Sequence, residues 1–432
     1  MEISELYNIF KQHPIVTTDS RDCPAGSIFF ALKGASFNGN AFAEKALEKG
    51  CSYAVVDEKD FAKDGDERYI MTDNCLKTLQ QLARFHRKTL GTKIIGITGT
   101  NGKTTTKELL ATVLSEKYNV LYTQGNFNNE IGVPKTLLRL TADHDIAVVE
   151  MGASHPGDIK ILVDIVEPDY GLITNVGRAH LQGFGSFEGV IRTKGELYDF
   201  IREHGGKIFI DAGNEHLKGI SGGMETLEYG TCTREDLCAN GNVVSCSPFL
   251  NFRWRHASGE WHEVNTHLIG SYNIQNMLAA ICAGLYFGVN PEQINHALSN
   301  YIPSNNRSEM KITPYNKLII DAYNANPTSM DAAIRNFKDI NADKKMAILG
   351  DMGELGDASE EEHAKIITLL NECDINNVWL VGSEFEKTVC DFRKFKNVEE
   401  VKEELTKNRP DGYCILIKGS NSTKLFQLPE LL

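Results

Sequence analysis

A glycine-rich segment, Gly99-Thr100-Asn101-Gly102-Lys103-Thr104, joins an apolar, β-branched run at residues 94–98 to a helix-forming segment at residues 103–118. A loop between a buried strand and a helix directs its backbone N–H groups and the positive helix end toward one point, where a polyphosphate can bind. Lys103 would reach the terminal phosphates and Thr104 would ligate magnesium. The segment therefore predicts an α/β fold built around a phosphate-binding loop.

This loop departs from the strict phosphate-loop pattern at one position. The strict pattern has glycine five positions before Gly102, sometimes replaced by alanine, and this chain has Ile97 there. A turn that merely contains Gly-Lys-Thr is the alternative, but the flanking strand and helix disfavour it. We therefore expect a variant phosphate loop.

The residues around this loop alternate between strand-like and helix-like patterns. Alternation of this kind requires crossover connections and predicts a mostly parallel sheet covered by helices on both faces. A helix at residues 273–287, followed by Gly288, is expected to close the domain. The strands are expected at residues 94–98, 120–123, 146–151, 172–176 and 207–210.

The chain of 432 residues is long enough for two or three domains. Residues 1–88 predict a small α/β unit with strands at 27–32 and 52–56 and a helix at 41–49, and the basic stretch 86–93 is interpreted as a linker. A second punctuated stretch, 301–307, precedes a new α/β alternation with strands at 318–321, 346–349, 378–381 and 414–417. We expect domains at 1–89, 90–301 and 302–432. Two helix starts are expected at Asn326-Pro327 and at a capping box, Ser359 to Glu362.

Composition excludes several classes of function. The formal charge of −13 disfavours nucleic acid and anionic membranes as partners. No run of eighteen apolar residues predicts a membrane span, and the acidic N-terminus shows no export signal, so we expect a cytoplasmic protein. The ten cysteines form no CxxC pair and are interpreted as reduced.

Three single residues of the central region are candidates for chemistry. Glu150 ends an expected strand at the sheet edge that carries the phosphate loop, where a magnesium ligand is expected, although a solvated acid is the alternative. His180 follows another strand, and alone it is as well explained as a structural residue. Lys194 is by default a solvated cation.

Three loops of the last third follow expected strands and gather at one sheet edge, which predicts a second binding face. They are residues 321–330, Gly350 to Gly356, and Lys418 to Ser420.

Together these motifs resemble the Mur ligase family, over nearly the whole chain. YNANP and GDMxELG are typical of its D-alanyl-D-alanine-adding branch, and the absent Asp-Asn-Pro-Arg signature argues against the branch that adds the third residue. The motifs are Asp19-Ser20-Arg21, Phe29 to Gly34, Phe37-Asn38-Gly39, GTNGKTTT from Gly99, Asn126 to Pro134, Glu150-Met151-Gly152, His180, Lys194, YNANPTSM from Tyr323, GDMGELG from Gly350 and Lys418-Gly419-Ser420.

The resemblance implies a first domain that holds a uridine diphosphate sugar, a central ATP domain, and a Rossmann-like third domain that brings D-alanyl-D-alanine. ATP would phosphorylate the terminal carboxylate of UDP-N-acetylmuramoyl-tripeptide, and the dipeptide amine would displace phosphate. We expect a monomer that needs two magnesium ions.

The resemblance also implies a role for individual residues. Lys103, Glu150, His180 and Lys194 would be catalytic, with one ion on Thr104 and Glu150 and the other on His180 and a carbamate of Lys194. Nucleotide contacts are expected from Gly99, Thr100, Asn101, Gly102, Lys103, Thr104, Thr105, Asn273, Asn276, Arg307, Asp321 and Asn326. Substrate contacts are expected from Ser20, Arg21, Lys33, Gly34, Asn38, Asn128, Asn129, Tyr323 and Asn324.

Two positions depart from the family pattern. Tyr272-Asn273 stands where His-Asn is common, and Asp321-Ala322 stands where Asp-Ser is common. Only the adenine contacts are affected. The alternatives are another Mur-like amide ligase, such as a folylpolyglutamate synthase, or a regulatory phosphate-loop NTPase. No residue predicts whether the third residue of the tripeptide is diaminopimelate or lysine.

Overall fold

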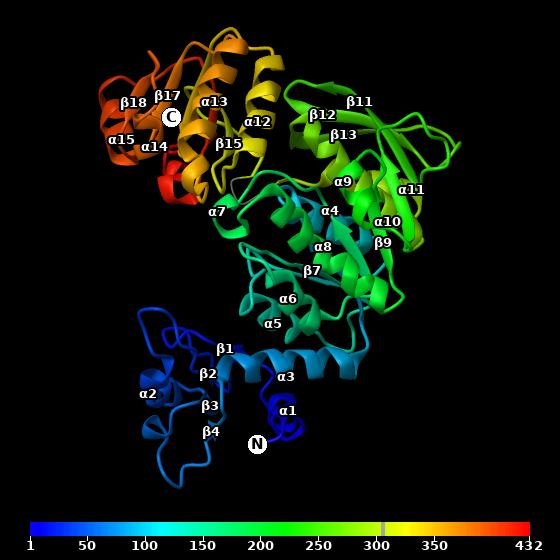
Figure 1. Ribbon diagram of the computed structural model, residues 1–432, viewed down its shortest axis with the longest axis vertical. Helices are drawn as coiled ribbons and strands as arrows, with labels where there is room; N and C mark the ends of the chain where they lie inside the picture. Colours follow the sequence, from blue (N-terminus) through cyan, green and yellow to red (C-terminus); the bar gives the residue numbers. More distant parts are fainter. Residues whose placement is uncertain (304–306) are drawn as a thin grey trace.

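Three sheets, one in each of three α/β bodies, follow one another along the chain in a computed structural model that describes residues 1–303 and 307–432. The first body lies at one end of the elongated molecule, the central body lies in the middle against helix α3 (Cys75–Leu90), and the third body lies at the other end (Figure 1). The α/β fold class and the three-domain order expected from the sequence are confirmed.

The central sheet has nine strands in the order β13-β12-β11-β10-β9-β8-β5-β7-β6. Neighbouring strands from β6 through to β11 run parallel, and β11, β12 and β13 form an antiparallel extension that the sequence interpretation missed. The strands are β5 (Lys93–Thr98), β6 (Val120–Tyr122), β7 (Ile146–Glu150), β8 (Tyr170–Ile173), β9 (Lys207–Asp211), β10 (Glu225–Gly230), β11 (Ala239–Cys246), β12 (Phe249–Arg255) and β13 (His262–Ile269).

Helices cover both faces of this sheet, as the alternation predicted. Helices α4 and α10 pack against each other on one face, and α6 and α8 pack together on the other. The helices of this body are α4 (Lys103–Ser115), α5 (Gly132–Leu137), α6 (Asp158–Val166), α7 (Leu181–Phe184), α8 (Phe187–Glu203), α9 (Glu215–Ile220), α10 (Ile274–Tyr286) and α11 (Pro291–Asn300).

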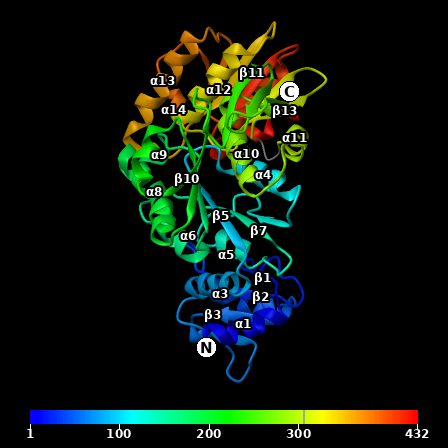
Figure 2. The ribbon, with the colours of Figure 1, turned by 90° about the vertical axis from the view of Figure 1, so that its right-hand side faces the viewer.

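The first body is a four-stranded parallel sheet, β1-β2-β3-β4, whose core is continuous with one face of the central sheet. Its helix α3 (Cys75–Leu90) lies beneath α5 (Figure 2) and packs against α1, α5 and α6. The other elements are α1 (Ile3–Gln12), β1 (Val16–Thr17), β2 (Ile28–Phe30), α2 (Ala43–Glu48), β3 (Tyr53–Val56) and β4 (Tyr69–Met71).

The interpretation of residues 86–93 as a linker is wrong for its first part. Residues through Leu90 belong to helix α3, which ends at Gly91 with a φ of 68°. Of the basic residues in this part of the helix only Lys88 lies on the solvent side, because Arg87 donates to the Val166 carbonyl and His86 is buried with Leu79 and Leu82.

The third body is a six-stranded sheet in the order β14-β15-β19-β16-β17-β18, parallel except for β14. Its strands are β14 (Glu309–Ile312), β15 (Lys317–Asp321), β16 (Lys345–Gly350), β17 (Val378–Val381), β18 (Arg393–Phe395) and β19 (Cys414–Lys418). Its helices are α12 (Pro327–Asp339), α13 (Ser359–Glu372), α14 (Ser383–Glu386) and α15 (Val398–Lys407).

One of the two expected helix starts in this body is confirmed. Asn326 caps α12 by accepting a hydrogen bond from the backbone N–H of Ser329. The expected capping box at Ser359 is wrong, because a short 3₁₀ turn (Gly356–Ala358) runs directly into α13 and makes Ser359 a helical residue. The Ser359 hydroxyl instead donates to Glu384.

The exact domain limits stay a prediction. The expected boundary at 301–307 includes residues 304–306, which lie outside the described residues. Within the described ranges, no helix combines the length and the apolar character needed to cross a membrane.

His86 ties the first body to the central one. Its Nε2 lies 2.9 Å from the carbonyl oxygen of Leu140 and its Nδ1 lies 3.2 Å from the hydroxyl of Tyr7. Because a carbonyl only accepts, Nε2 carries a proton, and a neutral ring satisfies both contacts. Burial lowers the pKa of His86 from its usual value of 6.5.

We predict that the stability of this junction falls in acid. Below about pH 6.5 the unfolded chain binds a proton at residue 86 that the folded chain resists, so the free energy of unfolding decreases as the pH falls. Urea unfolding is measured at about pH 7.5 and pH 5.5. Between these values the free energy of unfolding should fall less in His86→Gln than in the wild type. The exposed-site variant His267→Gln should keep the wild-type loss. An unchanged loss in His86→Gln would contradict this role.

Candidate active site

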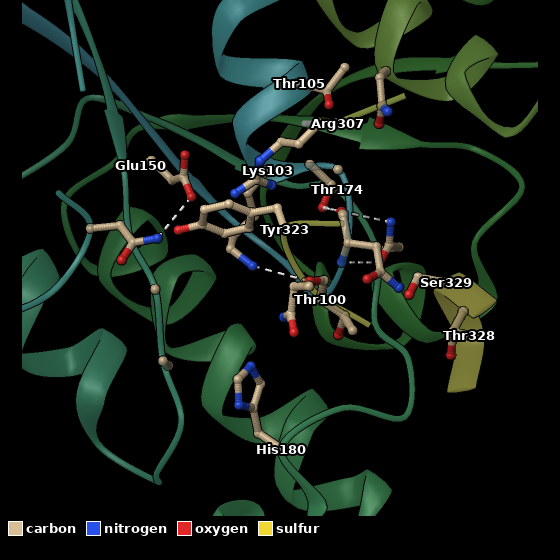
Figure 3. A pocket seen from close by; sticks show the side chains of 18 of the residues that line it. Thr100, Lys103, Thr105, Glu150, Thr174, His180, Arg307, Tyr323, Thr328 and Ser329 are labelled. Atoms are coloured by element: carbon tan, nitrogen blue, oxygen red, sulfur yellow. Dashed lines mark hydrogen bonds between the residues drawn. The ribbon is translucent and has the colours of Figure 1, made fainter. Parts of the chain in front are cut away.

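A cavity of about 750 Å³ lies between the central and third bodies, at the carboxyl ends of their parallel strands. Its walls combine the phosphate loop, the ends of β7 and β8 and the loop that follows β15 (Figure 3), together with Lys418 at the end of β19. The sequence motifs of two separate bodies therefore meet in one space.

Two glycines of the phosphate loop are required by close packing. Gly99 has a φ of 143°, and a Cβ atom there would lie 2.0 Å from the Oγ1 of Thr174. Gly102 has a φ of 78°, and a Cβ atom there would lie 2.7 Å from Oδ1 of Asn276. L side chains rarely adopt such backbone angles, so both positions need glycine.

The loop is held by the end of the neighbouring strand β8. The backbone N–H of Asn101 donates to Oδ1 of Asn175 over 3.0 Å, and the Thr174 hydroxyl donates to the Asn101 carbonyl over 2.6 Å. Thr174 and Asn175 also line the cavity. No motif marks these two residues in the sequence, although the rule that parallel strands end at one sheet edge points to them.

Thr104 and Glu150 meet behind the loop, as their predicted role requires. The Thr104 hydroxyl donates to Oε2 of Glu150 over 3.0 Å, and Asn128 Nδ2 donates to Oε1 over 2.9 Å. Glu150 is buried and Lys103 Nζ donates to the carbonyls of Gly99 and Thr100. The pair presents a hydroxyl and a carboxylate, the oxygen donors that Mg²⁺ prefers.

His180 follows strand β8, and Lys194 lies in helix α8. The His180 ring points into the cavity (Figure 3), and Nδ1 contacts the carboxylate of Glu354 of the third body. Lys194 is 2% exposed, and its Nζ has one hydrogen-bond partner among the described residues, the Ala153 carbonyl at 3.4 Å. Burial, helped by the charge of Lys103, lowers the pKa of Lys194 well below its usual value.

No group of three or more His, Cys, Asp or Glu side chains able to hold a metal is found within residues 1–303 and 307–432. Mg²⁺ in nucleotide enzymes is commonly held by one or two carboxylates together with phosphate oxygens and water. The Thr104–Glu150 pair fits such a partial site. Lys194 fits a carbamate because a buried, neutral amine is the form that reacts with carbon dioxide.

The third body contributes an ordered cation and an aromatic platform. Lys418, 1% exposed, donates to Asp321 over 2.5 Å, and the Arg307 guanidinium lies 3.8 Å from the ring centroid of Tyr323. Asn326 Nδ2 donates to Oδ1 of Asn101 over 2.8 Å, which joins the third body to the phosphate loop.

Asn273 and Asn276 form a polar chain under the loop. Thr106 Oγ1 donates to Oδ1 of Asn276, and Asn276 Nδ2 donates to Oδ1 of Asn273. Both asparagines line the cavity beside Tyr272, so they both support the phosphate-loop helix and face the space where a nucleotide would lie.

Most predicted site residues of the last two bodies line the cavity, and four do not. Those that line it are Thr100, Asn101, Gly102, Lys103, Thr105, Asn128, Asn129, Glu150, His180, Asn273, Asn276, Arg307, Asp321, Tyr323 and Asn324. Gly99, Thr104, Lys194 and Asn326 lie directly behind these and contact Lys103, Glu150, Ala153 and Asn101 respectively. Lining residues that the analysis did not single out include Ser154, Asp158, Asp211 and Gln275.

The five predicted substrate residues of the first body do not line this cavity. Lys33 forms ion pairs with Asp57 and Glu58, and Asn38 donates to Glu58 over 2.9 Å. Ser20, Arg21 and Gly34 lie on loops of the same small sheet, where Arg21 pairs with Asp19. The structure places these residues together on the first body but not with the phosphate loop.

A phosphate-loop domain combined with a second α/β domain across a shared polar cavity defines a nucleotide-binding enzyme. Family models agree along the chain: the Mur ligase family catalytic domain matches residues 14–87, the Mur ligase middle domain matches 97–284, and the Mur ligase glutamate ligase domain matches 306–421.

Individual relatives match this chain over nearly its full length. The UDP-N-acetylmuramoyl-tripeptide–D-alanyl-D-alanine ligase of Bacillus subtilis is 36% identical and covers 96% of this chain and 92% of its own. A crystal structure of MurF from Acinetobacter baumannii is 31% identical, with a TM-score of 0.85 over 96% of this chain and 92% of that one. The Thermotoga maritima MurF ligase in complex with ADP is 26% identical, with a TM-score of 0.85 over 97% of each chain. The chain therefore belongs to the Mur ligase family.

We predict that Gly99→Ala weakens nucleotide binding by about tenfold or more, because the backbone strain alone costs about 1–3 kcal/mol and the new methyl group collides with Thr174. Calorimetric titration with ADP measures the effect. Gly65→Ala is the matched control, since Gly65 also has a positive φ, of 80°, but has no atom within 4 Å of an added Cβ. Wild-type affinity in Gly99→Ala would contradict the packing argument.

Proposed function

We propose that the protein is an ATP-dependent amide ligase that adds D-alanyl-D-alanine to UDP-N-acetylmuramoyl-tripeptide, giving the pentapeptide precursor of peptidoglycan, ADP and phosphate. The observation that carries the proposal is the cavity where the phosphate loop and Glu150 of the central body face Arg307, Asp321 and Tyr323 of the third. The names of the full-length relatives support the choice of substrates.

The reaction activates a carboxylate before it forms an amide. The terminal carboxylate oxygen of the tripeptide attacks the γ-phosphorus of ATP, the bond to the β-phosphate bridging oxygen breaks, and ADP leaves. The amine of D-alanyl-D-alanine then attacks the carbonyl carbon, loses a proton, and expels phosphate with the former carboxylate oxygen. The first step is needed because a free carboxylate is a poor electrophile.

Lys103 is the residue that stabilises the transferred phosphoryl group. Its amine already lies within the loop, bonded to the Gly99 and Thr100 carbonyls, and a bound γ-phosphate offers it a stronger, anionic acceptor. Thr104 and Glu150 would hold one magnesium ion, and His180 and carbamylated Lys194 would hold a second. Bound Mg²⁺ neutralises the anions that must approach one another.

The remaining predicted residues orient the three substrates. Asn273, Asn276, Arg307, Asp321 and Asn326 border the nucleotide, whereas Tyr323 and Asn324 face the incoming dipeptide. Asn128 donates to the Glu150 carboxylate and Asn129 lines the same cavity, so both would contact the tripeptide. Ser20, Arg21, Lys33, Gly34 and Asn38 hold the uridine diphosphate end on the first body, away from the chemistry.

The setting follows from these substrates. ATP and nucleotide sugars are cytoplasmic metabolites, so the enzyme works in the cytoplasm, and we propose that it does so as a monomer. One chain carries all the residues assigned above.

Two alternatives make different predictions. A folylpolyglutamate synthase-type ligase would not need the four-stranded first body or the YNANP loop that faces the cavity. A regulatory phosphate-loop NTPase would not need a buried Lys194 or a third body bonded to the loop by Asn326.

We predict that phosphate release from ATP requires both acceptor substrates. A coupled phosphate assay should give turnover only when UDP-N-acetylmuramoyl-tripeptide and D-alanyl-D-alanine are present together. Equal phosphate release without either substrate would favour the NTPase.

Glu150→Gln should lower kcat by about a hundredfold or more, because a neutral amide holds the metal poorly.

We predict that Lys194→Ala loses most activity and regains part of it when a short carboxylate such as acetate is added, because the carboxylate replaces the carbamate oxygen atoms. Lys103→Ala is the matched control, since its lost cation cannot be replaced by an anion. Full activity of Lys194→Ala without additive would rule out a catalytic role for the carbamate. Rescue of both variants would show that the additive acts elsewhere.

A further inference from the structure

The loop that follows β16 reaches across the domain boundary and touches the predicted metal ligand His180. Glu354 lies in this loop, and its carboxylate contacts Nδ1 of His180. The backbone N–H of Gln182 also donates to the Glu354 carbonyl over 3.3 Å. The two contacts fix both the side chain and the backbone of Glu354 against the segment that carries His180.

The backbone on both sides of this contact is strained. His180 has a φ of 51° and Glu354 has a φ of 61°, the left-handed region that residues with a Cβ rarely adopt. Non-glycine residues in such conformations persist where the surroundings hold them. The two strained residues meet each other, so their contact is one of the interactions that hold both conformations.

The contact leaves only one ring nitrogen of His180 for another partner. The His180 side chain is 26% exposed, and its Nδ1 atom is buried against Glu354. Metal-binding histidines commonly donate their second ring N–H to a carboxylate, which sets the tautomer and the ring orientation. Here that carboxylate comes from a different domain.

We propose that Glu354 is a positioning residue, which holds the Nδ1–H tautomer of His180 so that Nε2 faces the cavity as a divalent-cation ligand. The inference rests on the proposed function, because His180 must be a metal ligand for the tautomer to matter. His180 therefore presents Nε2 to a metal ion only when the third body lies against the central one. Closure and assembly of the metal site are then one event.

A second contact two residues away provides a matched control. Arg178 Nη1 donates to Oε1 of Glu362 over 3.0 Å, and this pair also joins the central and third bodies. It does not touch His180. Glu362→Gln therefore weakens the domain contact without removing the carboxylate from the histidine.

The tautomer test uses nitrogen-15 NMR of histidine-labelled protein, with the His180 signals assigned by their loss in His180→Gln. The wild type and Glu354→Gln should show the Nδ1–H tautomer, since the Gln oxygen still accepts. Glu354→Ala should shift His180 toward the Nε2–H tautomer, and Glu362→Gln should match the wild type. A wild-type tautomer in Glu354→Ala, or the same shift in Glu362→Gln, would overturn the proposal.

The metal test titrates each full-length protein with Mn²⁺ in the presence of ADP and follows paramagnetic broadening of the His180 signals. Glu354→Ala should need about 10–100 times more Mn²⁺ than the wild type for equal broadening, the usual cost of losing such a partner. Equal titrations would overturn the positioning role while leaving the proposed function intact. Absence of broadening in the wild type would remove the second metal site, and this inference with it.

Discussion

The site depends on the packing of one turn, the backbone of Gly99 against the end of β8. A side chain at Gly99 has no room beside Thr174, and Thr174 and Asn175 in turn hold the Asn101 backbone. Backbone N–H groups bind a polyphosphate only if they are fixed before it arrives, because ordering them afterwards costs conformational entropy. Strand β8 fixes these groups, and the hydrogen bond from Asn326 to Asn101 links them to the third body.

The two domain junctions differ in their physical character. The first body shares a continuous apolar core with one face of the central sheet, and the buried His86 crosses that junction. The third body has a core of its own, to which the central body contributes mainly Ile269 and Phe249. It meets the central body through polar pairs such as Arg178–Glu362. Water competes well for polar pairs, so the junction between the central and third bodies is the one suited to open and close.

Local patterns were sufficient to predict the elements that build the site. The buried strand before Gly99, the helix after it and the strand that ends at Glu150 all carry their signals within a few residues. Helix α3 was missed at its end because its basic residues resemble a linker, although its apolar face is buried. Strand β13 was missed because its alternating buried and exposed residues belong to an antiparallel extension rather than to a parallel core.

Contacts between distant segments could not be predicted from the chain. Nothing local to Glu354 or His180 indicates that they touch, because their meeting depends on how the third body is placed. The first-body residues, which were predicted to hold the uridine diphosphate, do not line the cavity that contains Asn128 and Tyr323. Such a division fits a long substrate better than a single pocket does.

The central claim is that this cavity converts a carboxylate into an acyl phosphate before the amide forms. The direct measurement uses UDP-N-acetylmuramoyl-tripeptide labelled with oxygen-18 in its terminal carboxylate, followed by mass analysis of the phosphate released in a single turnover. The account predicts that one labelled oxygen passes to inorganic phosphate. Phosphate without label, formed together with the pentapeptide, would contradict it.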